Sequence, residues 1–444
     1  MRALCIKDSA SPQHTSNSQP SRFGTDPHHG MAHAGFGLVP QGIPGTPSPF
    51  SLQVPAADLH QLSSLIRTAV VGPPSFYNTH SVADDPDHAF GITREWFAAA
   101  ANEWVHKFDW RAHEKHWNSF PQFTINVTAP SDGQVFHLHF AALFSHRRDA
   151  TPVLFSHGWP SSWTEFVPVL ELLTEKYTPK TLPYHIVVPS IPDYGLSTRS
   201  GLTETELDFR GAAEALNELM KALGFDAYIA QGGDVGSGLT AALGTFHDEC
   251  KAVHFNNLIL TPSEMGAVSD LPVTPEEATT LARAAQFGDR DTGYLYEQGT
   301  KPGGISLALM SNPMALLAWI GTMYVEHTEY SLDTILQEVS WYWLTKSYGR
   351  SLWSYRSVWR AVLRDDNRKL PSPLAIQKKP LGYSWYPGEV LAAAKSWLEH
   401  WFPDNLVFYR AHESGGHLAA FDNPAGFLQD IEDFVAIVKT KVKF

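Results

Sequence analysis

The amino-acid sequence predicts an α/β protein whose parallel sheet is interrupted by a long helical insertion. Residues 152–155 and 185–188 are continuously apolar, which is typical of strands buried on both faces of a parallel sheet. Residues 227–237 predict a buried strand that turns directly into a helix. Between about 262 and 385 the hydrophobic period becomes mostly helical, and residues 405–409 then return to a strand pattern.

The composition indicates a globular protein with a large core. Of the 444 residues, 43% are hydrophobic and only 18% are charged. A net charge of −13 argues against nucleic acid and anionic membranes as partners. No apolar run approaches the roughly 18 residues of a membrane span, and no signal peptide is apparent at the N-terminus. We therefore expect a soluble, cytoplasmic protein.

Neither the cysteines nor the N-terminal histidines indicate a metal site. Cys5 and Cys250 lie far apart in the sequence, and two cysteines cannot form a metal cluster or make a structural disulfide probable here. Residues 1–45 are rich in Ser, Pro, Gly and His without any hydrophobic period. This composition predicts a disordered tail, and metal binding by its histidines is the less favoured interpretation.

The elements before the parallel sheet are two helices and several short strands. Residues 50–54 alternate like a strand, and residues 57–66 then carry apolar side chains at helical spacing. Residues 92–108 form a second helical stretch with aromatic side chains on one face. Residues 122–127 and 135–140 alternate like two strands, with a Ser-Asp-Gly hairpin turn between them.

The remaining core elements alternate between helix and strand. Residues 205–223 predict an amphipathic helix that stops at Gly224, and residues 252–255 predict another buried strand after the segment at 227–237. The last element is a helix over 424–438, for which Asn423 is a suitable N-cap because the proline that follows is tolerated in the first turn.

The segment Gln231-Gly232-Gly233-Asp234-Val235-Gly236-Ser237 has the spacing of a nucleophile elbow. Such a strand-to-helix turn needs glycine two residues on either side of the nucleophile, because a Cβ there would clash with the neighbouring backbone. Asp234 stands where lipases and esterases carry serine. A carboxylate attacks an alkylating centre, such as an epoxide carbon or a carbon bearing halide, and leaves an alkyl ester that water must cleave.

An oxyanion hole is predicted in His157-Gly158-Trp159-Pro160, at the carboxyl end of an upstream strand. Open α/β sheets place their sites at that edge. The backbone N–H groups of Trp159 and Val235 form a suitable donor pair for a tetrahedral oxyanion, and His157 and Pro160 are candidates for lining the substrate pocket. The alternative is an ordinary turn at the end of a strand.

A base and its carboxylate partner are expected late in the chain. His417 follows the final strand, and the glycines before it let the imidazole reach into a crowded site; His412 is the nearby alternative. Glu389 follows the preceding strand, where a carboxylate would hold the imidazole Nδ1–H. Glu413 and Asp422 are the alternative carboxylates.

Ring opening of an epoxide also needs a proton donor opposite the carboxylate, on the helical insertion. Tyrosines, whose pKa is near 10, are protonated at neutral pH and suit this role. The residues alone do not choose among the tyrosines of the insertion, which are Tyr294, Tyr296, Tyr324, Tyr330, Tyr342, Tyr348 and Tyr355.

The chain resembles the microsomal-type epoxide hydrolases of the α/β-hydrolase superfamily over about residues 48–440. The motifs that carry this resemblance are Pro49-Phe50, Phe108-Asp109-Trp110-Arg111, Phe120-Pro121-Gln122-Phe123, His157-Gly158-Trp159-Pro160, Gln231-Gly232-Gly233-Asp234, Pro387-Gly388-Glu389-Val390 and Gly415-Gly416-His417. The resemblance implies an α/β-hydrolase fold with a helical cap inserted after the middle strands and an N-terminal meander that wraps the core. The implied domains are a disordered tail at 1–45, an N-terminal region at 46–150, a core at 151–262 and 386–444, and a cap at 263–385.

The resemblance also implies residue roles: Asp234 as nucleophile, His417 as base and Glu389 as its acid partner. By their spacing, Tyr294 and Tyr355 match the two cap donors. Tyr296 and Trp353 are the alternatives if the register is displaced by two residues, and both are further candidates for lining the substrate pocket.

Three features depart from the family pattern. Val235 replaces the aromatic residue that often follows the nucleophile, which changes the pocket but keeps the backbone donor. Asp193 stands where a glycine is usual, and the N-terminal tail lacks the membrane anchor of the animal members. None of these changes removes a catalytic group.

The expected function is therefore a cofactor-free epoxide hydrolase that uses no metal and gives vicinal diols. The tryptophans of the cap favour an apolar or aryl epoxide, although such residues also build cap cores. A small-molecule epoxide is the expected partner, and a homodimer is admissible. The alternatives are a haloalkane dehalogenase, which shares the aspartate nucleophile, and a non-catalytic ligand-binding protein on the same fold.

Overall fold

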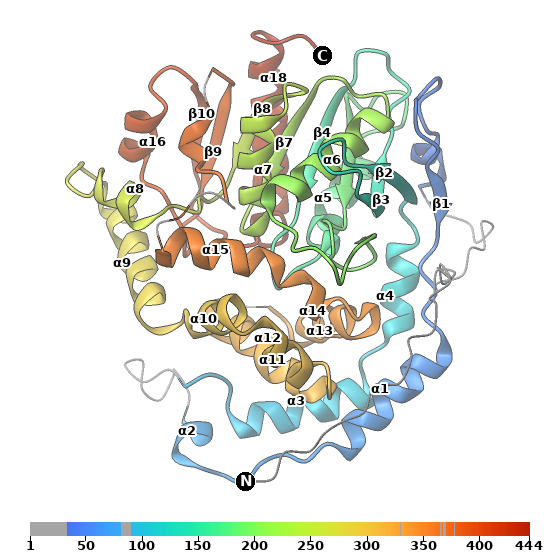
Figure 1. Cartoon of the computed structure of the whole chain (residues 1–444), viewed down its shortest axis with the longest axis vertical. Helices are drawn as coiled ribbons and strands as arrows, with labels where there is room; N and C mark the ends of the chain where they lie inside the picture. Colours follow the sequence, from blue (N-terminus) through green and yellow to red (C-terminus); the bar gives the residue numbers. More distant parts are fainter. Residues whose placement is uncertain (1–32, 81–89, 329, 365, 367–369, 377) are drawn as a thin grey trace, which may run out of the picture.

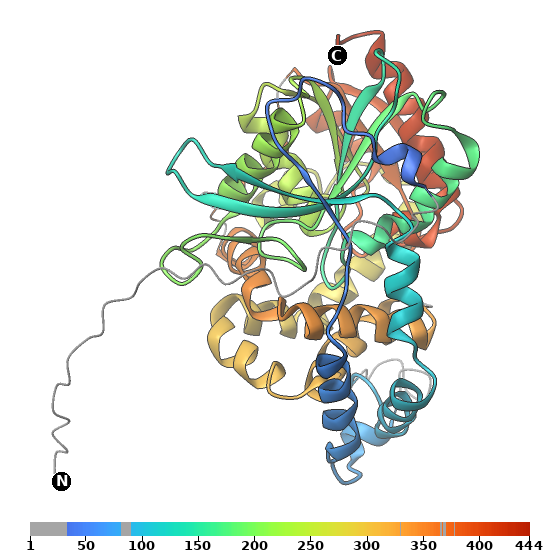
Figure 2. The ribbon, with the colours of Figure 1, turned by 90° about the vertical axis from the view of Figure 1, so that its right-hand side faces the viewer.

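The structure is a computed structural model that describes residues 33–80, 90–328, 330–364, 366, 370–376 and 378–444. A central sheet is covered by helices on both faces, and a separate helical layer lies beyond one end of the strands (Figure 1). The first helices of the chain lie against the far side of that helical layer (Figure 2).

One mixed sheet contains ten strands within the described residues. The strands are β1 (Ser48–Phe50), β2 (Gln122–Thr128), β3 (Val135–Leu143), β4 (Thr151–Ser156), β5 (Tyr184–Pro189), β6 (Thr198–Arg199), β7 (Tyr228–Gly232), β8 (Cys250–Phe255), β9 (Leu381–Trp385) and β10 (Leu406–Ala411). Their order is β1-β2-β3-β5-β4-β7-β8-β9-β10, with β6 paired to β3. The run from β5 to β10 is parallel, as predicted, and β1 to β3 extend it antiparallel.

The register of the parallel strands brings three loops to one place. Ser156 at the end of β4 pairs with Gly232 at the end of β7, and Gly232 pairs with Phe255 at the end of β8. Every residue of β4, β5 and β7 is buried, as continuous apolar runs predict. The loops after β4, β7 and β8 therefore meet at the carboxyl edge of the sheet, where sites form in α/β proteins.

Helices α6 (Phe209–Ala222) and α7 (Val235–Phe246) pack together on one face of the sheet, and α5 (Val167–Lys176) and α18 (Pro424–Lys439) pack together on the other (Figure 1). The Asn423 side chain accepts a hydrogen bond from the Gly426 N–H at the start of α18, which confirms the predicted N-cap. Helix α6 begins after Asp208, whose carboxylate caps it, so the predicted start at 205 is too early.

The helical cap lies between β8 and β9. Its helices are α8 (Pro262–Gly266), α9 (Pro275–Arg290), α10 (Gly293–Thr300), α11 (Pro302–Leu309), α12 (Pro313–His327), α13 (Leu332–Thr345), α14 (Tyr348–Ser351) and α15 (Trp353–Arg364). None of the described helices is by itself long and apolar enough to cross a membrane.

The N-terminal region joins the cap to the sheet. It contains α1 (Ala56–Thr68), α2 (Phe76–Thr79), α3 (Arg94–His106) and α4 (Trp110–Trp117). Helix α1 packs on α12 and α3 packs on α13, and the Trp104 indole N–H donates to the Ser340 hydroxyl at 2.9 Å. Because its strands belong to the sheet and its helices touch the cap, this region holds both parts together.

Several boundaries differ from those predicted. The strand predicted at 50–54 is β1, which covers only Ser48–Phe50. β9 lies inside the stretch assigned to the cap, and β2 and β3 of the N-terminal region join the core sheet. Residues 1–32 of the predicted tail lie outside the described residues, but Phe36 in a short 3-10 helix over Ala34–Gly37 is buried against the core.

Candidate functional site

Asp234 lies in the sharp turn between β7 and α7. Its backbone has φ 50° and ψ −125°, a strained conformation that side chains rarely adopt and that is found at functional turns. A Cβ on Gly232 would lie 2.1 Å from the Gly236 carbonyl oxygen, and a Cβ on Gly236 would lie 1.9 Å from the Ser156 carbonyl oxygen. Only glycine fits at both positions, so the elbow has the backbone geometry that its spacing predicts.

One oxygen of the Asp234 carboxylate accepts a hydrogen bond from the loop after β4 and belongs to the residue that directly precedes α7. The Trp159 N–H donates to Oδ1 at 2.7 Å, and Val235 is the first residue of α7, where helix N–H groups have no partner within the helix and the dipole favours negative charge. A Cβ on Gly158 would lie 2.6 Å from the Asp234 Cβ, so glycine is needed for the loop to come this close. The Asn257 amide oxygen accepts from the Asp234 N–H at 3.0 Å and fixes the turn.

His417 bridges Asp234 and Glu389. Its Nε2 lies 3.2 Å from Asp234 Oδ2, and its Nδ1 lies 2.8 Å from Glu389 Oε1. The Glu389 side chain has no exposed surface, and the Leu391 N–H also donates to Oε1 at 2.7 Å. Burial lowers the pKa of His417, but the charges of Glu389 and Asp234 outweigh burial and raise that pKa well above its ordinary value.

Tyr294 on α10 and Tyr355 on α15 lie together above Trp159. The ring centroids of Tyr294 and Trp159 are 5.4 Å apart in a stacked pair, those of Tyr355 and Trp159 are 5.0 Å apart, and the two tyrosines are 5.5 Å from each other. Burial raises the pKa of both phenols, and the nearby Asp234 charge raises each further. Both hydroxyls therefore keep their protons at neutral pH.

The other predicted residues make no side-chain hydrogen bond to Asp234, His417 or Glu389 within the described residues. Tyr296 is 49% exposed on α10, and the Trp353 indole N–H donates to the Pro192 carbonyl at 3.0 Å, where the ring holds the cap on the core. His157 is buried with both ring nitrogens bonded to main-chain groups, and burial lowers its pKa to about 4. Pro160 is buried in the loop after Trp159. His157 and Trp353 are thus supports of the site's loops.

Comparison with known proteins identifies the family. Residues 47–166 match the family described as Epoxide hydrolase N terminus, and residues 151–316 match the alpha/beta hydrolase fold. The structure of Aspergillus niger epoxide hydrolase is 38% identical in sequence, with a TM-score of 0.81 over 91% of this chain and 100% of that chain. This chain belongs to the epoxide hydrolase family.

Two further relatives agree with this membership. A Dothistroma septosporum protein that is provisionally assigned as an epoxide hydrolase is 39% identical over 91% of this chain and 93% of its own length. Juvenile hormone epoxide hydrolase from the silkworm Bombyx mori is 24% identical, and its TM-score of 0.76 over 90% of this chain and 96% of that chain shows the same fold. The enzyme is therefore an epoxide hydrolase with the α/β-hydrolase fold.

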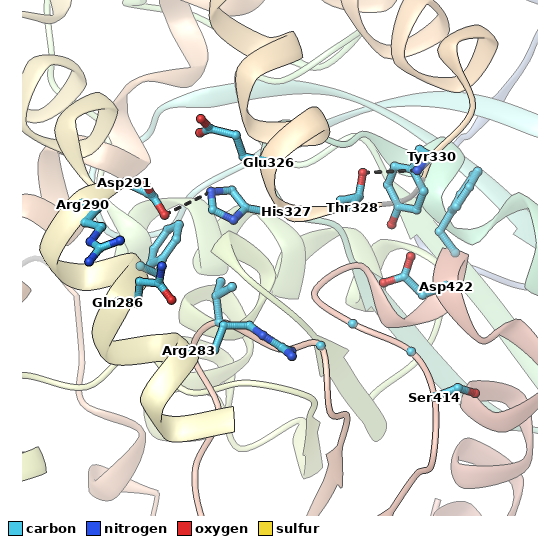
Figure 3. A pocket seen from close by; sticks show the side chains of 16 residues that line it. Arg283, Gln286, Arg290, Asp291, Glu326, His327, Thr328, Tyr330, Ser414 and Asp422 are labelled. Carbon is cyan, nitrogen blue, oxygen red and sulfur yellow. Dashed lines mark hydrogen bonds and ion pairs between the residues drawn. The ribbon is translucent and has the colours of Figure 1, made fainter. Parts of the chain in front are cut away.

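A cavity of about 820 Å³ lies between the cap of the enzyme and the loops that carry Glu389 and His417 (Figure 3). Its cap side is formed by α9 and the end of α12, and its core side includes Gly416 and Asp422. Phe287 lines the cavity, and its ring centroid is 6.5 Å from that of Tyr294. No three His, Cys, Asp or Glu side chains of the described ranges are grouped to hold a metal ion.

Two buried polar groups beside the site were not predicted from the sequence. Asn257 follows the carboxyl end of β8, the edge of an α/β sheet where functional sites form. Its position after a predicted strand could therefore have indicated that it belongs to the site. Glu165 accepts from the Ser161 hydroxyl at 2.6 Å and from the Gly158 N–H at 3.4 Å. No sequence pattern distinguishes this acid from a surface residue, yet it braces the loop that carries Trp159.

Glu165 makes stability depend on pH. Burial raises its pKa to about 8, against the opposing effect of its hydrogen bonds. Since that pKa exceeds the unfolded value of about 4.3, the stabilising contribution of the neutral acid is complete below about pH 4 and is lost as the pH rises toward about 8. A Glu165→Gln variant stays neutral, so its free energy of unfolding should exceed that of the wild type by roughly a few kcal/mol at high pH.

Urea unfolding of both proteins at a series of pH values from about 5.5 to 8.5 measures this difference. The difference in free energy of unfolding between the variant and the wild type should increase as the pH rises. A gap that stays constant over this range would mean that the folded-state pKa of Glu165 is not raised.

Proposed function

We propose that the enzyme converts an apolar or aryl epoxide to a vicinal diol through a covalent ester on Asp234. The single observation that carries the proposal is the arrangement around this carboxylate. Oδ1 accepts a hydrogen bond from the Trp159 N–H at 2.7 Å, and Oδ2 lies 3.2 Å from His417 Nε2. The rings of Tyr294 and Tyr355 pack on the Trp159 ring beside this carboxylate. Each group that a two-step hydrolysis needs is within reach of one carboxylate.

In the first step, Asp234 Oδ2 attacks an epoxide carbon and forms a C–O bond. The ring C–O bond breaks, and its electron pair goes to the epoxide oxygen. The hydroxyls of Tyr294 and Tyr355 stabilise this developing oxide and supply a proton, since burial and the Asp234 charge keep both phenols protonated. Oδ1 becomes the carbonyl oxygen of the ester.

Formation of the ester prepares His417 for the second step. The carboxylate charge of Asp234 is one of the groups that raise the pKa of His417, and the ester no longer carries that charge. The pKa of His417 therefore falls when the ester forms, and the imidazole can then take a proton from water. Glu389 remains bonded to Nδ1 at 2.8 Å and stabilises the imidazolium as it forms.

In the second step, the oxygen of the activated water attacks Cγ of Asp234. The negative charge moves to Oδ1, where the N–H groups of Trp159 and Val235 stabilise it. The tetrahedral intermediate then breaks the Cγ–Oδ2 bond, and the leaving diol oxygen takes the proton from His417. The proton that the attacking water leaves on the Asp234 acid returns to the tyrosinate formed in the first step. The overall reaction therefore adds one water to one epoxide and regenerates both the carboxylate and the phenol.

The walls of the site support an apolar or aryl substrate. Trp159, Tyr294 and Tyr355 form a continuous aromatic surface around the carboxylate, and Phe287 extends it toward the cavity. Aromatic faces bind flat apolar groups by stacking and by burial of apolar area. An aryl or branched alkyl substituent on the epoxide therefore finds matching surface here.

Loss of either phenol is expected to slow ring opening. Tyr294→Phe or Tyr355→Phe removes one donor without changing the ring, and we expect the rate of ester formation to fall about 10- to 100-fold in each. Rapid-quench measurement of ester formation under single-turnover conditions tests this. Tyr296→Phe is the matched control because Tyr296 lies on the same helix but is 49% exposed. Equal effects of all three substitutions would contradict the assignment.

The reaction class is tested by offering aryl, alkyl and terpenoid epoxides beside matching bromoalkanes. We expect diols from the epoxides and no bromide release. A haloalkane dehalogenase needs N–H donors for the halide, and Val235 supplies no aromatic N–H next to the nucleophile. Bromide release without diol would favour the dehalogenase, and tight epoxide binding without any product would favour a binding protein.

A further inference from the structure

The cavity beside the proposed base has a second carboxylate, half-buried, in its wall. Asp422 ends α17 (Ala419–Asp422), five residues after His417. A Cβ on Gly416 would lie 3.0 Å from Asp422 Oδ2, so this oxygen lies directly against the backbone that precedes His417. The His417 imidazole is hydrogen-bonded to Glu389 and Asp234. Within the described residues, Asp422 makes no hydrogen bond to this ring.

A cap tyrosine faces this carboxylate across the cavity. Tyr330, between α12 and α13, points its hydroxyl toward Asp422 (Figure 3). Its ring packs edge-on against Phe421 with centroids 5.0 Å apart, and against Tyr324 at 5.6 Å. The ring is therefore held in place by one residue of the cap and one residue of α17.

The loop that carries His417 is otherwise held by neutral contacts. The Gly388 N–H donates to the Gly415 carbonyl at 3.0 Å, and the Asn256 amide donates to the His417 carbonyl at 3.3 Å. The Asn423 amide donates to the Ser414 carbonyl at 3.2 Å. These bonds fix the backbone, but none of them changes the charge that the imidazole experiences.

We propose that Asp422 is a second positioning carboxylate for His417, that Tyr330 orients it from the cap, and that this pair controls hydrolysis of the ester rather than its formation. The inference rests on the proposed function, because it assumes the ester on Asp234. Its physical basis is that a negative charge behind the base stabilises the imidazolium that forms when water gives up its proton.

Charges of both signs surround Asp422 and His417. Burial, the largest effect, and the charge of Glu389 raise the pKa of Asp422, and the Tyr330 hydroxyl, the His417 charge and the Gly416 N–H oppose this rise by favouring the ionised form. Around His417, the other groups are Glu389 and Asp234 at hydrogen-bond distance, with Glu165 and His327 farther away.

The experiment measures the two half-reactions separately in single turnovers, on full-length wild type, Asp422→Asn, Tyr330→Phe and the double variant. For Asp422→Asn we expect ester formation at the wild-type rate and ester hydrolysis slowed several-fold. The lower limb of its hydrolysis pH profile should move to lower pH by about one unit, because the imidazolium loses a neighbouring charge. Tyr330→Phe should show a smaller change in the same direction.

Three comparisons keep the result specific. Asp422→Glu should restore most of the hydrolysis rate, and the double variant should be no slower than Asp422→Asn, because the tyrosine acts through the carboxylate. Gln286→Ala, on the α9 wall of the same cavity, should behave as the wild type. Together these results would support the positioning role.

The inference is overturned if both half-reactions slow together, if the pH limb does not move, or if the two single effects multiply in the double variant. Any of these outcomes leaves the proposed function intact as long as the wild type forms and hydrolyses an ester. Diol production by the wild type through a route without an ester would instead remove the proposed function itself.

Discussion

An Asp234→Ala enzyme is expected to form neither ester nor diol. The substitution removes the atom that attacks the epoxide, and no other carboxylate is hydrogen-bonded to both the Trp159 N–H and His417 in the described residues. Loss of a nucleophile typically costs about 10⁴-fold or more in turnover. Diol formation by chromatography and intact-protein mass after incubation with an aryl epoxide measure the two products.

The control for this experiment must account for the strained turn. Asp234 has φ 50°, which alanine adopts less readily than aspartate or asparagine, so the thermal unfolding midpoint of each variant has to be compared with that of the wild type. Asp234→Asn keeps the shape and removes the charge, and it should also be inactive in initial rates. A folded Asp234→Ala enzyme with more than about one hundredth of wild-type turnover would show that another group is the nucleophile.

A His417→Gln enzyme is expected to complete one alkylation and then stop. Asp234 still attacks the epoxide, but no base remains to activate water, so hydrolysis of the ester should slow about 10²- to 10⁴-fold. The ester should appear as a mass increase equal to the epoxide, located on the peptide that contains Asp234. Steady-state diol formation should be nearly absent while this adduct accumulates.

The matched control is His412→Gln, because sequence alone offers His412 as an alternative base. Its Nε2 lies 2.6 Å from Asp430, within the packing of β10 and α18, and away from Asp234. We expect this variant to hydrolyse its ester without accumulation. An adduct trapped by His412→Gln but not by His417→Gln would reverse the assignment.

The nucleophile elbow and the strand before it could be predicted because the tight turn and the buried sheet both leave marks in the same short segment. The segment around Asp234 needs glycine at two fixed positions, and a continuous apolar strand precedes it, so spacing alone indicates the turn. The antiparallel extension of the sheet was harder to predict. Phe140 on β3 pairs with Pro189 on β5, across a separation in sequence that no local period reveals.

The cap shows where sequence patterns stop being informative. Tyr294 and Tyr296 are two residues apart, which places them on different sides of α10, but the short helix Gly293–Thr300 has no clear apolar stripe to tell which side faces the core. The resemblance to the epoxide hydrolases favoured Tyr294, which the structure brings beside Trp159. Buried acids such as Glu165 could not be predicted, because an acid in a sequence is usually a surface residue.

The most direct test of the mechanism follows oxygen from isotopically labelled water through a single turnover. With enzyme in excess over an aryl epoxide in ¹⁸O water, the diol oxygen that comes from Asp234 Oδ2 should be unlabelled, and one ¹⁸O atom should appear in the Asp234 carboxylate. Mass analysis of the diol and of the peptide that contains Asp234 measures both. Label in the diol with none in Asp234 would mean direct attack of water on the epoxide and would contradict the ester.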